Sequence, residues 1–437
     1  MIDALGSPWL AYAALLLVTG YSRLRCGGWF APAAFVGLVW SFFTGASLLV
    51  VDYPVPGRGL WMLVLLIIAI QLGGLVAHEI RPLSPALSPA GENTLESWIA
   101  PCRRYGLLCT VVASAGCMYF LFSSLEDFGL PLTWIGVLEV GAKWTLLRYA
   151  DAVEPWSVRV LITWFHPAAL LGGVLFVCSR KLRDHWIGVT TLLPAVLYGV
   201  LTGARAAILL GLTCWIGGYV AAQCVRNPGP LILFSARRIT LLLLAAVSMV
   251  GMFGSIDAIR DAKWTQALTF ELHGQRLSNY MFGSPAAFAD WYAHAGTTEL
   301  QWGARTFAGE FEMLRLKTRT VGAYSDMTNV VGTESTNVYT LFRGLIEDFG
   351  AMGAVLIVAG IGAVVEMSFA ARLKNARSSL FCLSAFYAFF LFSPLVSLFS
   401  FNGATLAWIV AWFVLRRKPR PLLLPFVPPS PREAEVL

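Results

Sequence analysis

Eleven long apolar segments, nearly free of charge, constrain this chain more than any other feature. They lie near residues 8–22, 30–51, 60–77, 105–123, 159–178, 186–202, 206–222, 239–256, 352–369, 379–399 and 403–415. Each is apolar around its whole circumference, as a helix surrounded by lipid must be. Only 13% of the 437 residues are charged, and the unbroken apolar runs do not alternate as β-barrel strands do. The sequence therefore predicts an all-α, polytopic transmembrane helix bundle of about 11 spans.

The distribution of lysine and arginine predicts the orientation of this bundle. If the N-terminus lies outside and the loops alternate, the inner loops hold 19 of the 32 basic residues, at least two in every short loop. This is the positive-inside pattern. We therefore expect an outer N-terminus and a cytoplasmic C-terminus, and the net charge of +7 requires no nucleic-acid partner. No cysteine falls in an outer loop and no Cys/His spacing is typical of a metal site, so we expect neither disulfides nor a metal.

The polar residues outside the spans define the domain organisation. We expect one membrane domain over residues 1–418 and a proline-rich cytoplasmic tail over 419–437. On the outer side the loop 124–158 is expected to form a helix lying at the membrane interface. The second outer loop, 257–351, is too long for a plain connector and mixes arginines with carboxylates and aromatic residues. That mixture suits the recognition of a polar, anionic ligand at a membrane surface.

Arg205 is the first candidate for chemistry. It stands in LTGARAAILL, where Gly203-Ala204-Arg205 joins two apolar segments on the outer face. An arginine that enters a span is costly and usually functional, and Gly203 allows a ligand or backbone to approach closely. The alternative is an arginine whose side chain extends to the outer lipid headgroups.

The segment ESTNVYTLFRGLIEDFGAMG, residues 334–353, is the second candidate. Its apolar residues repeat at helical spacing, while Thr336, Thr340, Arg343 and Glu347 fall at i, i+4, i+7 and i+11. We therefore predict an amphipathic helix that Ser335 or Thr336 caps and Gly350 ends. It would present Arg343 with Glu347 near the outer leaflet. The alternative is a salt bridge on a solvated face.

Two further arginines, Arg276 and Arg305, stand beside glycine and aromatic residues in the long outer loop, as a sugar or phosphate site would need. The alternative for each is a solvated loop arginine. The chain has no G-x-x-x-x-G-K-[ST] motif, so ATP is not expected as the energy source. It also has no D-x-D motif, since Glu310-Phe311-Glu312 is only a weak analogue, and this disfavours a metal-bound nucleotide-sugar donor.

At these residues the chain resembles the Wzy-type O-antigen polymerases, also called oligosaccharide repeat unit polymerases. LTGARAAILL is similar to the family's T-G-[SA]-R segment, and STNVYTLFRGLIEDFGAMG is similar to its N-V-[YF]-T…[DE]-F-G-x-x-G segment. The FGSPAAFADW stretch, the number of spans and the long late loop fit as well. The similarity runs from about residue 140 to 400, and the N-terminal part contributes topology only.

The resemblance implies a GT-C-like membrane glycosyltransferase in the bacterial inner membrane, with its active site facing the periplasm. Such an enzyme moves a growing glycan from undecaprenyl diphosphate to the sugar of an incoming lipid-linked repeat unit. The transfer is a direct inverting displacement without a nucleotide donor, cofactor or metal. The implied partners are undecaprenyl-diphosphate-linked glycans, the lipid bilayer and a Wzz-type chain-length co-polymerase.

The residues present are consistent with this chemistry. Without a metal, arginines must stabilise the diphosphate leaving group, and we expect Arg205, Arg343 and Arg276 to do so. A carboxylate would accept the proton of the attacking hydroxyl, and the candidates Glu334, Glu347 and Asp348 stay open. The residues expected to bind the sugars and phosphates are Arg305, Asn337, Tyr339, Trp291 and Trp302.

Three other functions compete with polymerisation. An O-antigen ligase, which passes the glycan to lipid A core, would share the arginine of the turn, but the NVYT…EDFG segment favours the polymerase. A transporter of lipid-linked oligosaccharides usually has internal repeats and charges in mid-span, and neither is evident. A structural membrane protein would not need so many arginines in its outer loops.

Overall fold

A computed structural model describes residues 6–80, 92–150, 152, 154–227, 251–259, 270–295, 299–317, 324, 326–331 and 334–416. Most of the predicted span 239–256 and the whole predicted tail 419–437 lie outside these residues. The N-terminal helices are α2 (Pro8–Cys26), α3 (Pro32–Val50), α4 (Gly57–Ile80), α5 (Glu92–Asp127), α6 (Trp134–Tyr149), α7 (Trp156–Ile162) and α8 (Phe165–Cys178).

The elements that follow are α9 (Leu182–Thr190), α10 (Leu193–Thr202), α11 (Arg205–Arg226), α13 (Phe270–His294), α14 (Ala308–Met313), β1 (Thr328–Val331), β2 (Glu334–Thr336), α15 (Leu341–Ala370), η1 (Ala371–Leu373), α16 (Ala376–Phe392), η2 (Leu398–Ser400) and α17 (Asn402–Arg416). Residues 251–259 are also helical. The two short strands form one antiparallel pair with Thr328 opposite Thr336. The predicted all-α class is therefore confirmed for the described residues, apart from this small hairpin.

Seven helical stretches of the described chain are long and apolar enough to cross a membrane. They are Pro32–Val50, Gly57–Ile80, Leu95–Asp127, Trp156–Cys178, Leu182–Thr202, Arg205–Arg226 and Leu341–Ala370. A shorter apolar helix, Ala376–Phe392, adds to these. The protein is therefore a polytopic, membrane-embedded helix bundle.

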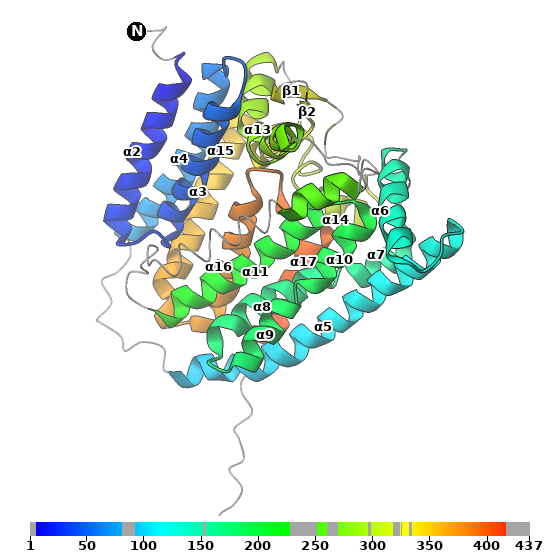
Figure 1. The fold of residues 1–437 in the computed structure, drawn as a ribbon. Coiled ribbons are helices and arrows are strands. Elements are labelled where there is room, and N and C mark those ends of the chain that lie inside the picture. The colour runs from blue at the N-terminus through cyan, green and yellow to red at the C-terminus, as the bar shows by residue number, and fades with distance from the viewer. Residues whose placement is uncertain are drawn as a thin grey trace, which may run out of the picture.

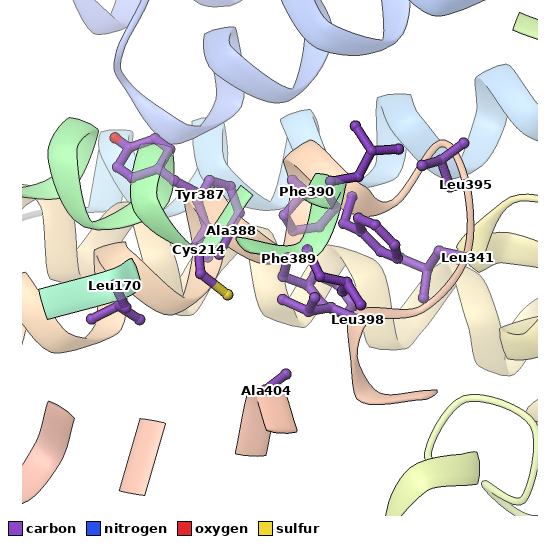
Figure 2. Packing of buried hydrophobic residues seen from close by; sticks show 14 of the residues in the cluster. Leu170, Cys214, Leu341, Tyr387, Ala388, Phe389, Phe390, Leu395, Leu398 and Ala404 are labelled. Atoms are coloured by element: carbon purple, nitrogen blue, oxygen red, sulfur yellow. The ribbon is translucent and has the colours of Figure 1, made fainter. Parts of the chain in front are cut away.

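The bundle has two groups of helices joined by α16 (Figure 1). In one group α2, α3, α4 and α15 pack side by side, and in the other α8 packs against α5, α11 and α17. Figure 2 shows residues of α16 between the groups, where Ala388 lies near Cys214 of α11 and Phe389 lies near Leu398 of η2. These side chains are buried, so α16 holds the two groups together through a dense aromatic core.

The helix ends meet at two faces of the bundle. At one face the ends of α2, α4, α8, α11, α15 and α17 gather with the starts of α5 and α9, and basic residues pair there: Arg25 with Glu79, Arg103 with Asp184, Arg226 with the carbonyl of Val177, and Arg372 with the carbonyl of Cys224. Trp98 also donates to the carbonyl of Leu415. We call this the basic end.

The opposite face carries the elements of the long loop. Helix α13 lies across the start of α4 and against the β1–β2 hairpin, which appears beside α13 at the upper right of α15 in Figure 1. Asn279 of α13 donates to the carbonyl of Ser335, and Ser284 donates to the carbonyl of Pro394. The predicted long outer loop is thus a folded layer on the bundle, which we call the loop layer.

The predicted helix over 334–353 needs two corrections. Ser335 and Thr336 belong to β2, and the helix begins only at Leu341, after Thr340. Ser335 and Thr336 therefore do not cap it, because their backbone is already paired with β1. Gly350 does interrupt the helix, with φ 72° and ψ 166°, but α15 continues beyond it to Ala370.

The predicted interface helix in loop 124–158 corresponds to α6. Thr133 caps it, since its hydroxyl oxygen accepts the N–H of Gly136. Trp134 is exposed, whereas Trp144 packs against the ring of Phe120 and donates to the hydroxyl of Ser124. Helix α6 is therefore anchored on α5 through Trp144.

Candidate functional site

The turn between α10 and α11 places Arg205 at the edge of the loop layer. Gly203 ends α10 in the left-handed conformation, with φ 61°, and the N–H of Ala204 closes the turn on the carbonyl of Gly199. Arg205 is then the first residue of α11, and its side chain is only 7% exposed. The predicted turn and the entry of the arginine into a span are confirmed.

The guanidinium of Arg205 is held by two residues of the loop layer. It forms an ion pair with the carboxylate of Asp257, which is itself buried. Its central carbon lies 5.3 Å from the ring centroid of Tyr280 on α13, a cation–π distance. The side chain therefore turns into the protein and not toward the lipid headgroups, so that alternative is wrong.

Arg343 occupies a second buried position, in the first turn of α15. Its Nε donates to Glu347 Oε1 over 2.8 Å, and its Nη2 donates to Asp326 Oδ2 over 2.6 Å. The side chains of Arg343 and Glu347 are 5% and 8% exposed, so their pair is not on a solvated face. Asp326 is 57% exposed and reaches the guanidinium from the solvent side.

Glu347 is bound by a second arginine. Its Oε2 lies 3.1 Å from Nε of Arg305, which is one-third exposed. The carboxylate thus lies between two guanidinium groups, one from its own helix and one from the loop that precedes α14. The fixed charges of this group balance when Asp326 is included, because two cations face two anions.

Asp348, the next residue, has a different task. Its side chain is fully buried, and its two oxygens accept the backbone N–H groups of Arg305 and Thr306 over 3.0 and 2.6 Å. The backbone carbonyl of Asp348 also accepts the N–H of Trp302. Asp348 therefore fixes the loop that carries Arg305, and its carboxylate is already occupied.

Aromatic rings enclose the guanidinium of Arg343 on three sides. Its central carbon lies 3.9 Å from the ring centroid of Tyr324, 4.2 Å from that of Tyr339 and 5.0 Å from that of Trp291. Burial, reinforced by the nearby Glu347 carboxylate, raises the pKa of Tyr324, so this phenol stays protonated. We call Arg343, Glu347, Arg305, Asp326 and these three rings the arginine cage.

A further tyrosine lies at the border of the cage. Burial, followed by the negative charge of Asp290, raises the pKa of Tyr53 to about 12. Tyr53 belongs to the short connection between α3 and α4, whose Asp52 N–H donates to the carbonyl of Val330 in β1. The N-terminal helices therefore also contribute to this region.

The two buried arginines do not share one cluster. Tyr280 contacts Arg205 and Trp291 contacts Arg343, and both rings belong to α13. Eleven residues correspond to three helical turns, so the two rings lie on the same side of α13, about 16 Å apart. The loop layer therefore presents two cationic positions along one helix.

The remaining predicted residues are distributed over these two positions and the surface. Arg276 is half-buried on α13, one turn before Tyr280, and so belongs to the Arg205 position. Asn337 donates to the carbonyl of Tyr324 and supports the cage from outside. Trp302 has a 74% exposed side chain, and its backbone N–H donates to the carbonyl of Asp348. Glu334 lies in β2, and its side chain is outside the described part of the chain.

Three important residues were not among the predicted ones: Tyr324, Asp326 and Asp257. Tyr324 and Asp326 stand in an irregular stretch where no periodicity assigns a direction to a side chain. Asp257 follows the apolar segment 239–256, so the sequence alone marks it only as the polar residue that ends this segment. Its pairing with Arg205 joins residues 52 positions apart, which spacing alone does not indicate.

Comparison of the whole chain with protein-family models, with curated proteins and with solved structures finds no match.

Proposed function

We propose that this protein polymerises oligosaccharide repeat units carried on undecaprenyl diphosphate, by inverting glycosyl transfer on the periplasmic face of a bacterial inner membrane. The observation that carries the proposal is the arginine cage, in which a buried carboxylate lies between two guanidinium groups and beside three aromatic rings. Carboxylate, fixed cations and aromatic faces are the groups that glycosyl transfer from a lipid diphosphate needs.

The two cationic positions match the two lipid diphosphates of such a reaction. In the proposal, Arg343 and Arg305 receive the diphosphate of the growing chain, the leaving group. Arg205 and Arg276 hold the diphosphate of the incoming repeat unit, whose far sugar must reach the reacting carbon. The separation of about 16 Å along α13 is then spanned by the repeat unit itself.

Glu347 is the proposed general base. The acceptor hydroxyl attacks the anomeric carbon, its proton passes to Glu347, and the bond to the diphosphate oxygen breaks with its electron pair on that oxygen. When the diphosphate engages Arg343 and Arg305, Glu347 shares these two guanidinium groups with the substrate, so its carboxylate lies beside the bond that breaks. Asp348 is the weaker candidate because two backbone N–H groups already occupy its oxygens.

The orientation in the membrane is part of the proposal. The basic end gathers the arginines of α2, α5, α11 and η1, and basic residues favour the cytoplasmic side. The loop layer with both cationic positions then faces the periplasm, in a GT-C-like arrangement with about 11 spans. Reporter fusions after Arg416 and before Pro8 test this directly, since the proposal requires a cytoplasmic C-terminus and a periplasmic N-terminus.

The decisive experiment is a reconstitution of the purified chain with undecaprenyl-diphosphate-linked repeat units and no nucleotide, with and without EDTA. We expect a ladder of lengthening products on a gel in both conditions. Arg343→Ala and Arg205→Ala should abolish the ladder. The matched control is Arg159→Ala, because Arg159 also pairs with one glutamate, Glu312, but lies outside both cationic positions.

Each failure has a distinct meaning. A ladder that survives both arginine substitutions removes the proposed site but keeps the activity. Absence of a ladder from folded protein with authentic substrate rejects the polymerase. Product formation on added lipid A core would then identify a ligase, and movement of labelled lipid-linked oligosaccharide across vesicles would identify a transporter.

A further inference from the structure

Three residues that can bind a metal lie together near the basic end, away from the arginine cage. Cys26 is the last residue of α2, His78 lies in the last turn of α4, and Glu366 lies on the far part of α15. Their ligand atoms all lie within 4.8 Å of one another. Along α15, Glu366 is about 30 Å from the cage, so this group is independent of the proposed catalysis. Figure 1 shows the three helices side by side.

Glu366 gives the strongest sign that a ligand belongs here. Its side chain is 1% exposed, and among the described residues its Oε2 has no hydrogen-bond partner. The Nδ1 atom of His78 is likewise buried without a hydrogen bond in the described chain. Burial of an ionised carboxylate without full compensation is costly, and at membrane depth such a residue is usually functional.

The geometry suits a tetrahedral metal ion. His78 Nδ1 and Glu366 Oε1 are 3.6 Å apart. Two ligands of one tetrahedral zinc ion, each about 2 Å from the metal, are separated by about 3.3 Å, so these atoms need almost no movement. The sulfur of Cys26, the last residue of α2, lies within 4.8 Å of both other ligand atoms. In a tetrahedral zinc site sulfur and nitrogen or oxygen ligands are about 3.5 Å apart, so the sulfur has to approach by about 1 Å.

We propose that Cys26 Sγ, His78 Nδ1 and the carboxylate of Glu366 bind one Zn²⁺ ion, with water as the fourth ligand. Sulfur, imidazole nitrogen and carboxylate oxygen together are a ligand set that zinc accepts. A thiolate, a neutral imidazole and a carboxylate balance the double positive charge, so the bound site is neutral. The ion would cross-link α2, α4 and α15 at the basic end, through residues that are far apart in the sequence.

The sequence does not reveal this site, because its ligands are separated by 52 and 288 residues and each stands alone on its helix. A sequence motif reveals a metal site only when its ligands are a few residues apart. The sequence analysis therefore predicted no metal. The inference does not rest on the proposed polymerase activity. Its test measures metal binding directly, so the zinc site and the polymerase activity can each be rejected independently of the other.

The test uses the full-length protein in detergent, stripped with a chelator and titrated with Zn²⁺ against a chromophoric competitor. We expect one equivalent to bind tightly, and Cys26→Ser and Glu366→Gln each to weaken binding at least about 100-fold. Co²⁺ in place of Zn²⁺ should give a thiolate-to-cobalt absorption band that Cys26→Ser removes. Two matched controls, Cys382→Ser and Glu79→Gln, should leave binding and the band unchanged.

Thermal unfolding separates lost binding from lost folding. Cys26 is half-buried, so the serine variant without metal should melt at the temperature of the metal-free parent. Excess Zn²⁺ should raise the melting temperature of the parent but not that of Cys26→Ser. The proposal is overturned if the parent binds no equivalent of zinc, or if Cys26→Ser and Glu366→Gln bind it as the parent does.

Discussion

Arg343 and Glu347 form a buried ion pair one turn apart on α15, with 2.8 Å between Nε and Oε1. The same carboxylate meets Arg305 with its other oxygen, so one glutamate orients two guanidinium groups. Glu347 is therefore placed to influence both charge and proton transfer in the cage. Its neighbour Asp348 binds only backbone N–H groups, and the two acids should respond differently to neutralisation.

We expect Glu347→Gln to lower the rate of polymerisation at least about 100-fold, the usual range for a lost general base. Asp348→Asn should instead lower the free energy of unfolding by about 1–3 kcal/mol, because one amide N–H would face a backbone N–H. Ladder formation and thermal unfolding, measured on both variants, separate the roles. Equal loss of activity at equal stability would contradict this division.

Substitution of Asp326 is expected to improve substrate binding, whereas substitution of Glu347 is expected to impair activity. Asp326 is the exposed partner of Arg343, and a substrate phosphate would compete with it for Nη2. Asp326→Asn should therefore lower KM for the lipid-linked substrate several-fold and change stability by less than about 1 kcal/mol. Glu312→Gln, which removes the partner of Arg159, should leave KM unchanged. A higher KM for Asp326→Asn would show that the aspartate assists binding.

The α15 segment shows how much the sequence can predict. Helical spacing placed Arg343 and Glu347 on one polar stripe, and their pair was therefore expected. Spacing did not show that Tyr324, Tyr339 and Trp291 surround it. Tyr324 comes from a loop, Tyr339 from the connection between β2 and α15, and Trp291 from α13. Burial of the pair depends on those contacts, so the solvated alternative stayed open at the level of sequence.

The turn at Arg205 was more predictable than its surroundings. Gly203 between two apolar runs fixes a short turn, and the next residue must start a helix. The acid that pairs with Arg205 is determined by how the loop layer folds over the bundle. The local sequence around Arg205 carries no information about that folding. The same reason explains why two arginines expected in one cluster occupy separate positions along α13.

A double-mutant cycle tests whether Arg205 does more than pair with Asp257. Arg205→Ala or Asp257→Ala alone leaves a buried charge, and each should lower the free energy of unfolding by about 3–5 kcal/mol. The double variant removes both charges and should regain most of that loss. Polymerisation should nevertheless stay absent, because no cation remains for the diphosphate. Recovery of the ladder in the double variant would make Arg205 purely structural.

Glu310 yields a pH prediction. Burial raises the pKa of Glu310, although the hydroxyl of Thr405 donates to its Oε1. A carboxyl whose pKa is higher in the folded state stabilises the fold fully below its unfolded pKa. This contribution is lost as the pH rises through the folded pKa. Glu310→Gln keeps an acceptor for Thr405 without the charge.

We therefore expect Glu310→Gln to raise the melting temperature at neutral pH by about 1–3 °C. Near pH 4, where the parent carboxyl is also protonated, the two proteins should melt alike. Thermal unfolding at both pH values provides the measurement, and Glu299→Gln, on an exposed stretch, serves as a control without this effect. A lower melting temperature for Glu310→Gln at neutral pH would mean that its charge is needed.

Gly350 separates the part of α15 that carries the cage from the part that spans the bundle. Its φ of 72° and ψ of 166° lie in a region that only glycine adopts without strain. Space is not the constraint, since an added Cβ would meet only Leu300 Cδ2, at 3.8 Å. Gly360, ten residues further on, has helical backbone and nothing within 4 Å of an added Cβ.

The two glycines therefore form a matched pair for the last prediction. Gly350→Ala should lower the free energy of unfolding by about 1–3 kcal/mol, or force the helix straight and move Arg343 away from Tyr324. Gly360→Ala should raise stability by about 0.5–1 kcal/mol, because alanine favours the helix. Thermal unfolding gives the first comparison and the product ladder the second. If the kink positions the cage, Gly350→Ala loses activity at temperatures where it is still folded, whereas Gly360→Ala keeps it; equal activity of the two would show that the kink is not required.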